Sequence, residues 1–169
     1  MKKLNKKGQV VLSFNYITAV VIMGVILLFG AISVTKLMKD VDSVQSQKFK
    51  SDFEKNIAEA STSIYSVQKI ELSGLKDFKK VCFVDFEKKS DVLEGELGSN
   101  YATIKEYLNY NISNIFLIDG DVKENFLNRK LQIDDPYYLC LDVSKSGTIN
   151  LILTGLGKKV KLEEYTKTQ

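Results

Sequence analysis

The residue types that carry most enzyme chemistry are scarce in this chain of 169 residues, which contains no His and only two Cys. The absence of His excludes Ser-His-Asp and Cys-His catalysis, His-ligated zinc and haem held by His, and two Cys cannot complete a structural zinc site. No carboxylate pair stands out as a glycosidase-like acid and base. We therefore expect a protein that is not an enzyme and that uses no metal or cofactor.

The two cysteines, Cys82 and Cys140, each fall in the middle of a segment rich in strand-forming residues. Disulfides persist in the oxidising surroundings outside the cell. A bridge between these residues would close a loop of about 60 residues, which the loop-entropy treatment values at around 4 kcal/mol. We expect this disulfide if the C-terminal part of the chain is external; two buried free thiols are the alternative.

Asn111 begins the triplet Asn111-Ile112-Ser113, the acceptor sequence for N-linked glycosylation. Such triplets also occur often by chance. This one falls in the loop between a predicted helix and a predicted strand, in the part of the chain expected outside the cell. Asn111 is therefore a candidate glycosylation site.

Four aspartates stand in two close pairs, Asp119 with Asp121 and Asp134 with Asp135. Clustered oxygen ligands of this kind suit Ca²⁺. However, each pair lies beside a turn signal, Gly120 or Pro136, where Asp is favoured in any case. The pairs also lack the D-x-[DN]-x-[DN]-G spacing of a calcium loop. The sequence therefore predicts turns here rather than a metal site.

One segment near the N-terminus is suited to a membrane. Residues 10–34 read VVLSFNYITAVVIMGVILLFGAISV, without one charged residue. A helix needs about 20 such residues to cross the hydrocarbon core, and the run is too long for the apolar region of a secretory signal peptide. The alternative is a buried helix of a soluble protein, which so small a domain would hardly cover. We expect a membrane-spanning helix in the lipid bilayer.

Lysines set the expected orientation of this helix. Four of them precede the run: Lys2, Lys3, Lys6 and Lys7. Beyond the run, Lys36 and Lys39 are interleaved with Asp40 and Asp42. Because cytoplasmic flanks carry the excess of Lys and Arg, we expect a single pass through the cell membrane, with the N-terminus cytoplasmic and the C-terminal domain extracellular.

Polar side chains gather at the start of the run, among them Ser13 and Asn15. An amide in lipid seeks a hydrogen-bonding partner across a helix–helix contact, so Asn15 is a candidate for assembly. The alternative is that Asn15 lies close enough to the headgroups to be hydrated.

Apolar residues at helical spacing continue beyond the run in two stripes. The first comprises Leu37, Val41 and Val44; the second comprises Phe49, Phe53, Ile57, Ala60 and Ile64. At about 100° per residue the two stripes point roughly 150° apart, so the register changes between Gln45 and Lys48. We expect the second stripe to pack in the core of the following domain. The first stripe is a candidate for contact with lipid headgroups or a neighbouring subunit.

The rest of the chain predicts an α+β head domain. Strands are predicted at 67–72, 80–86, 114–119, 137–143, 148–154 and 160–162, and a helix at 101–110. Residues 121–131 fit either a short helix or a loop. The last three strands read as a meander, because Gly-containing turns join them. We expect a mostly antiparallel sheet with the second stripe of the long N-terminal helix packed on one face.

The expected organisation is therefore a basic leader at 1–8, a transmembrane helix at 9–34, a helical stalk at 35–66 and a β-rich head at 67–169. The formal net charge is +3, and Arg129 is the one arginine among 24 basic residues. With no Arg-rich face for phosphate or base contacts, we expect no nucleic-acid partner.

The stretch Lys6-Lys7-Gly8-Gln9, followed directly by the apolar run, resembles the class III signal peptide of archaeal type IV pilin-like proteins. In that family a prepilin peptidase cuts after the Gly at the cytoplasmic face. The resemblance implies that Gly8 is the last residue removed and Gln9 the first of the mature chain. It covers residues 6–34, and over the head only the architecture agrees. It further implies assembly with copies of itself or with other pilin-like subunits.

Ser13 occupies the place where many pilins carry a Glu that is thought to pair with a neighbouring subunit. Two functions are therefore expected. The first is a pilin-like or pseudopilin-like structural subunit. The alternative is an unprocessed, signal-anchored surface protein whose head binds a partner or an envelope component.

Overall fold

The computed structural model describes residues 6–91 and 95–165; within its first helix, the side chains of residues 6–15 and 31–43 lie outside the description. The chain divides into two compact units, Met1–Ser43 and Val44–Gln169, and the second unit is the head of the folded protein. The second unit begins inside the stretch 35–66 that the sequence assigns to a stalk. The reason is that the second apolar stripe belongs to the core of the head.

Helix α1 (Lys6–Thr62) contains no Pro and ends where the chain turns into the first strand. The Ser63 N–H donates to the Ala60 carbonyl at 3.2 Å, and Tyr65 adopts a left-handed conformation with φ of 60°. Ile64 is therefore a strand residue, 68% exposed, and its assignment to the second stripe is wrong. The helical spacing of apolar residues predicts a longer helix, because a turn that contains neither Gly nor Pro leaves no signal in the sequence.

The other members of the second stripe lie in the core. Phe49, Phe53, Ile57 and Ala60 are at most 1% exposed. The Phe53 ring stacks on Phe83 with centroids 5.4 Å apart and meets Phe126 edge-on at 6.1 Å. The end of α1 is thus part of the head's own hydrophobic core, which also takes side chains from both sheets.

Among the described residues, eight strands form two four-stranded sheets. Sheet A has the order β1-β7-β8-β5, with β1 (Ile64–Ser73), β7 (Thr148–Leu156), β8 (Val160–Glu164) and β5 (Leu131–Gln132). Sheet B has the order β4-β3-β2-β6, with β4 (Asp121–Phe126), β3 (Ile115–Asp119), β2 (Lys80–Val84) and β6 (Tyr138–Asp142). All pairings are antiparallel except that of β5 with β8. The predicted α+β class and the mostly antiparallel strand pairing are confirmed, but the strands form two sheets and not the single sheet expected from the sequence.

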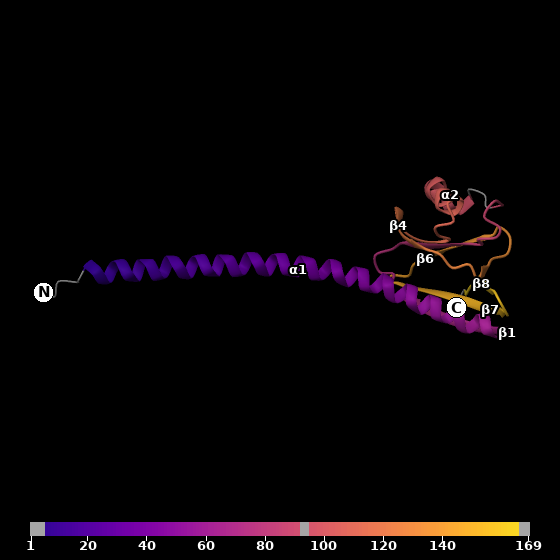
Figure 1. Ribbon diagram of the computed structural model, residues 1–169, viewed down its shortest axis with the longest axis horizontal. Coiled ribbons are helices and arrows are strands. Elements are labelled where there is room, and N and C mark those ends of the chain that lie inside the picture. Colours follow the sequence, from indigo (N-terminus) through magenta and orange to yellow (C-terminus); the bar gives the residue numbers. More distant parts are fainter. Residues whose placement is uncertain (1–5, 92–94, 166–169) are drawn as a thin grey trace. The chain divides into compact units, whose positions relative to one another are not determined.

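Sheet B has a buried face on each side. Val81 and Phe83 of β2 point into the core shared with α1 and sheet A, whereas Cys82 and Val84 point to a second cluster under α2 (Tyr101–Asn109). Ile104 and Leu108 of α2 are buried there, as their helical spacing predicts. Figure 1 shows α2 lying over sheet B, on the side away from sheet A. A short 3-10 helix, Gly95–Asn100, precedes α2.

Two details of the strand arrangement differ from expectation. Strands β6 and β7 belong to different sheets, so the predicted three-strand meander is reduced to the β7–β8 hairpin. Residues 121–126, left open between helix and loop, form β4, which pairs with β3 across Gly120. Alternating apolar residues and a turn signal show that a segment is extended, but they do not select its partner, because burial on either sheet satisfies the same pattern.

Gly155 marks the closest approach of α1 to sheet A. A Cβ atom at this position would collide with the backbone carbonyl oxygens of Ala60 and Ser63, where the helix ends against β7. Gly155→Ala is therefore expected to lower the free energy of unfolding by about 1–3 kcal/mol, the range for overpacking. Urea unfolding of the full chain in detergent, followed by tyrosine fluorescence, measures this. Asn150→Ala, on the half-exposed face of the same strand, is the control, and equal effects of the two substitutions would contradict the prediction.

Candidate functional site

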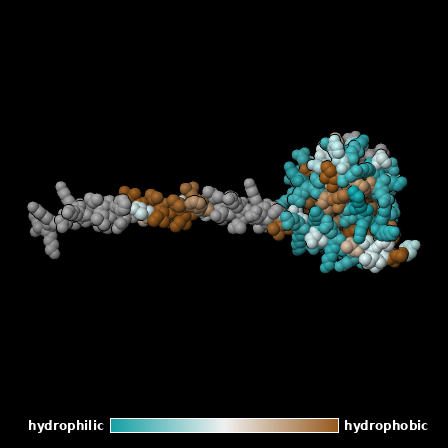
Figure 2. Space-filling view, in the orientation of Figure 1, coloured by the Kyte–Doolittle hydropathy of each residue, from teal (hydrophilic) through white to brown (hydrophobic). Residues whose placement is uncertain are grey.

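Residues 16–30, the part of the first unit whose side chains the structure describes, present a continuous apolar surface. Within residues 16–30, every side chain is exposed and none is charged. Exposed fractions of its large apolar residues run from 45% at Val25 to 74% at Tyr16. Figure 2 shows this stretch as strongly hydrophobic, in contrast to the mixed surface of the head. Apolar surface of this extent marks a site that contacts lipid or another protein.

Among the residues that the structure describes, no helical stretch is both long and apolar enough to cross a membrane. The side chains of the expected cleavage site and of most expected assembly residues lie outside the described residues: Lys7, Gly8, Gln9, Ser13, Asn15, Leu37 and Val41. Val44 is the described member of the first stripe, and its side chain is 61% exposed.

The expected disulfide is confirmed. Cys82 on β2 and Cys140 on β6 lie directly opposite each other in sheet B and are bonded. Cys82 is fully buried in the cluster beneath α2, against which Cys140 also packs. The bridge therefore joins two neighbouring strands that are 58 residues apart in the chain.

The glycosylation triplet is divided by the fold. Asn111 is exposed at the end of α2, in a left-handed conformation, and its side-chain oxygen accepts a hydrogen bond from the Lys89 ammonium. Ser113 is fully buried, and its hydroxyl has no hydrogen-bond partner among the described residues. In the folded head the acceptor amide is therefore accessible, while the hydroxyl of the same triplet is not.

The aspartate pairs serve turns and ion pairs. Asp119 and Asp121 flank Gly120, and Lys79 lies 2.7 Å from Asp119. The hydrogen bond and the charge of Lys79 lower the pKa of Asp119. Asp134 pairs with Lys161 at 2.8 Å, and the hydrogen bond that the Lys161 ammonium donates to this carboxylate raises the pKa of Lys161. Within residues 6–91 and 95–165 no cluster of His, Cys, Asp or Glu is placed to hold a metal ion.

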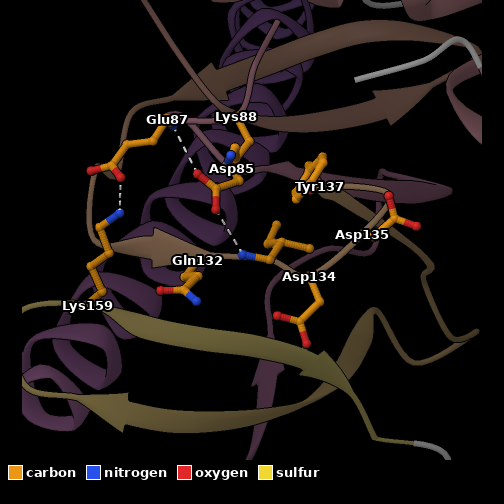
Figure 3. A pocket seen from close by; sticks show the side chains of 9 residues that line it. Asp85, Glu87, Lys88, Gln132, Asp134, Asp135, Tyr137 and Lys159 are labelled. Carbon is orange, nitrogen blue, oxygen red and sulfur yellow. Dashed lines mark hydrogen bonds and ion pairs between the residues drawn. The ribbon is translucent and has the colours of Figure 1, made fainter. Parts of the chain in front are cut away.

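A cavity of about 430 Å³ opens between the loop after β2, strand β5 and the turn before β6. Its lining is mostly polar and charged: Asp85, Glu87, Lys88, Gln132, Ile133, Asp134, Asp135, Tyr137 and Lys159. Figure 3 shows these side chains arranged around Asp85, which joins the three segments. The turn contains a cis peptide bond between Asp135 and Pro136.

Asp85 is 3% exposed, and its carboxylate is satisfied by the backbone. One oxygen accepts from the Glu87 N–H at 2.9 Å and the other from the Ile133 N–H at 3.2 Å, while its own N–H donates to the Tyr137 carbonyl at 2.9 Å. Glu87 and Lys159, which both line the cavity, form an ion pair with each other (Figure 3). The Asp85 carboxylate thus ties the loop after β2 to the end of β5, and two other carboxylates of the lining, those of Glu87 and Asp134, form ion pairs with lysines.

Asp85→Ala should lower the free energy of unfolding by about 2–3 kcal/mol, because it removes two charge-assisted hydrogen bonds and leaves the buried Ile133 N–H without a partner. Asp85→Asn, which keeps the shape and one acceptor, should cost less. Thermal unfolding of the full chain gives both values. Asp121→Ala, which removes an exposed carboxylate at the start of β4, is the control; a similar loss there would show that Asp85 has no special role.

The sequence does not indicate this cavity. Asp85 directly follows β2 (Lys80–Val84), whereas the strand predicted from the sequence at 80–86 includes it. Its partner Glu87 is two residues away in the same loop, but its partner Ile133 is 48 residues away, so that second contact depends on the tertiary structure. Comparison with known protein families, with curated proteins and with solved structures finds no match to this chain.

Proposed function

We propose that this chain is a type IV pilin-like or pseudopilin-like structural subunit, held in the cell membrane by its N-terminal helix. The observation that carries the proposal is the uncharged surface of residues 16–30, exposed on every side. Burying apolar surface is favourable by about 25 cal/mol per Å², so this segment gains stability when lipid or a neighbouring helix covers it. The charge-free run at 10–34 has the length for a membrane span.

The join between the anchor and the head supports the same proposal. Helix α1 includes the apolar run and continues to Thr62, and its last turns supply Phe49, Phe53 and Ile57 to the core of the head. A head built around the end of its own anchor helix cannot separate from that helix without losing its core. The same helix thus acts as membrane anchor and stalk, and it displays the head outside the cell.

The basic leader supports processing and orientation. Lys6-Lys7-Gly8-Gln9 resembles a class III signal peptide, with prepilin peptidase cutting after Gly8 at the cytoplasmic face. The lysines before the run keep the N-terminus cytoplasmic. The Cys82–Cys140 disulfide fits an oxidising, external location of the head.

The alternative is an unprocessed, signal-anchored surface protein whose head binds a partner or envelope component. Ser13 favours it, because the Glu that many pilins carry at this place is thought to pair with a neighbouring subunit during assembly.

The native N-terminus distinguishes the two. Intact mass and N-terminal sequencing of chain recovered from membranes should give a product that begins at Gln9. Gly8→Phe should remain full length, whereas the control Gly24→Ala, at a glycine with open space around it, should be processed normally. A native chain that begins at Met1 or Lys2 would favour the alternative. Recovery in the supernatant after alkaline extraction would contradict membrane anchoring in both forms.

A further inference from the structure

Strand β1 is an outer strand of sheet A and has one free edge. Among the described strands it pairs with β7 alone. Its pairing is irregular between Ile64 and Val67, where Tyr65 has a positive φ, and at the other end Gly74 turns the chain away with φ of 99°. Between these limits Val67–Ser73 is regular. Free edges of this length pair readily with another strand unless charges or bulges prevent it.

The regular segment is able to pair with itself. In an antiparallel pair related by a two-fold axis perpendicular to the sheet, one residue must lie opposite its own copy. Full overlap of Val67–Ser73 with the same segment of a second copy places the axis at Ile70. This register sets Lys69 opposite Glu71 of the second copy, and Glu71 opposite Lys69 of the second copy. The register of maximum overlap is therefore also the register of charge complementarity.

Burial along β1 agrees with this arrangement. Lys69 and Glu71 are exposed on the solvent face of sheet A, while Ile70 points to the core face and is only half-buried. Lys69 lies over the Tyr165 ring at 4.5 Å from its centroid, a contact on the same solvent face. Pairing at Ile70 covers its exposed half with Ile70 of the second copy and adds the unpaired backbone groups of the edge to the sheet.

Strand β4, an outer strand of sheet B, does not have this property. It has similar length, but its central residues are Lys123 and Glu124, which are adjacent rather than two apart. A two-fold axis at Lys123 sets two lysines opposite each other, and an axis at Glu124 sets two glutamates opposite each other. Like charges directly opposite destabilise a strand pair. The two edges therefore differ in the spacing of their charges, and also in regularity, because the pairing of β4 with β3 is interrupted at Lys123.

We propose that β1 is a docking surface for a second copy of this chain, joined edge to edge in an antiparallel pair centred on Ile70. The helical segment of the head runs antiparallel to β1, because Gly74, after the end of β1, lies against Gln45, whereas β1 begins just after Thr62. The two-fold axis therefore places the Val44 ends of the two copies at opposite ends of the joined sheet. The partner that fits is a copy that approaches from the opposite direction.

Two variants with reversed charges on β1 test this contact. Because the substitutions lie on β1 alone, they distinguish pairing of the strands from association of the apolar helices. Lys69→Glu alone and Glu71→Lys alone each set like charges opposite each other twice, and each should raise the dissociation constant of the head-to-head dimer by roughly tenfold. An equimolar mixture of the two variants restores two opposite-charge pairs and should form heterodimers as tightly as the unchanged chain dimerises. Sedimentation velocity of the full chain in detergent, with one variant labelled in the mixture, measures the four dissociation constants, those of the unchanged chain, of each variant alone and of the heterodimer.

Lys123→Glu on the edge of β4 is the matched control and should leave the dissociation constant unchanged. Ile70→Cys provides a direct readout of register, because the two natural cysteines are bonded to each other and the sequence contains no other. Mild oxidation should link the introduced thiols of two copies in high yield. The proposal is overturned if the mixed variants associate no better than either alone, or if Ile70→Cys links no faster than Lys123→Cys.

Discussion

Replacing Phe53 with Ala is expected to lower the free energy of unfolding of the head by about 3–5 kcal/mol, the range for removing a buried aromatic side chain. Phe53 is fully buried, and its ring contacts three others, Phe49, Phe83 and Phe126. These rings come from α1, β2 and β4. The cavity left by the substitution would lie where the helix meets the strands of sheet B, so the surrounding elements cannot close it independently.

Urea unfolding of the full chain in detergent, followed by tyrosine fluorescence, measures the effect. Tyr110→Ala is the control, because it removes an aromatic ring that is 69% exposed at the end of α2. The prediction requires the Phe53 variant to lose several times more stability than the Tyr110 variant. Near-equal losses would mean that the end of α1 is not part of the folding core of the head.

Removing the disulfide has the second large expected effect. The Cys82→Ala, Cys140→Ala double variant should lose around 4 kcal/mol, because the bridge restricts the unfolded chain over a separation of 58 residues. The cost falls on unfolding of the whole head, since β2 pairs with both β3 and β6. The double variant avoids the separate question of whether a reductant reaches the buried Cys82.

Unfolding is measured with and without a thiol reductant. The reductant should destabilise the unchanged chain to the level of the double variant and leave the double variant unaffected. If the double variant unfolds at the same urea concentration as the unchanged chain, the bridge contributes no stability. If the reductant destabilises the double variant, the effect of the reductant on stability is not due to reduction of this disulfide.

Much of the fold follows from local pattern. The helical spacing of the apolar residues between Tyr101 and Leu108 indicates the buried face of α2. In the same way, the second stripe indicates which residues of α1 enter the core. The strand at Lys80–Val84 follows from its β-branched and aromatic residues. These features are predictable because each element must bury one face, and the period of the apolar residues reveals which face that is.

Strand partners are not predictable in this way. Strands β6 and β7 are separated by one short turn, as in a hairpin, yet β6 pairs with β2 and β7 with β1. Asn114 is a second example of contacts between distant segments. Its buried side chain donates to the carbonyls of Val84 and Asn128 and accepts from the Asn128 N–H, so it joins three segments of the chain. Nothing in the residues around Asn114 indicates either partner.

The sequence by itself determined the apolar run, the cluster of basic residues before it, four of the five residues of the second stripe and the α+β class, because composition and periodicity are properties of neighbouring residues. The tertiary structure alone decided the division into two sheets, the burial of Asp85 between three segments, the burial of Ser113 within its glycosylation triplet and the free edge of β1. Each of these depends on which distant segments meet, and that is settled by packing the whole chain at once.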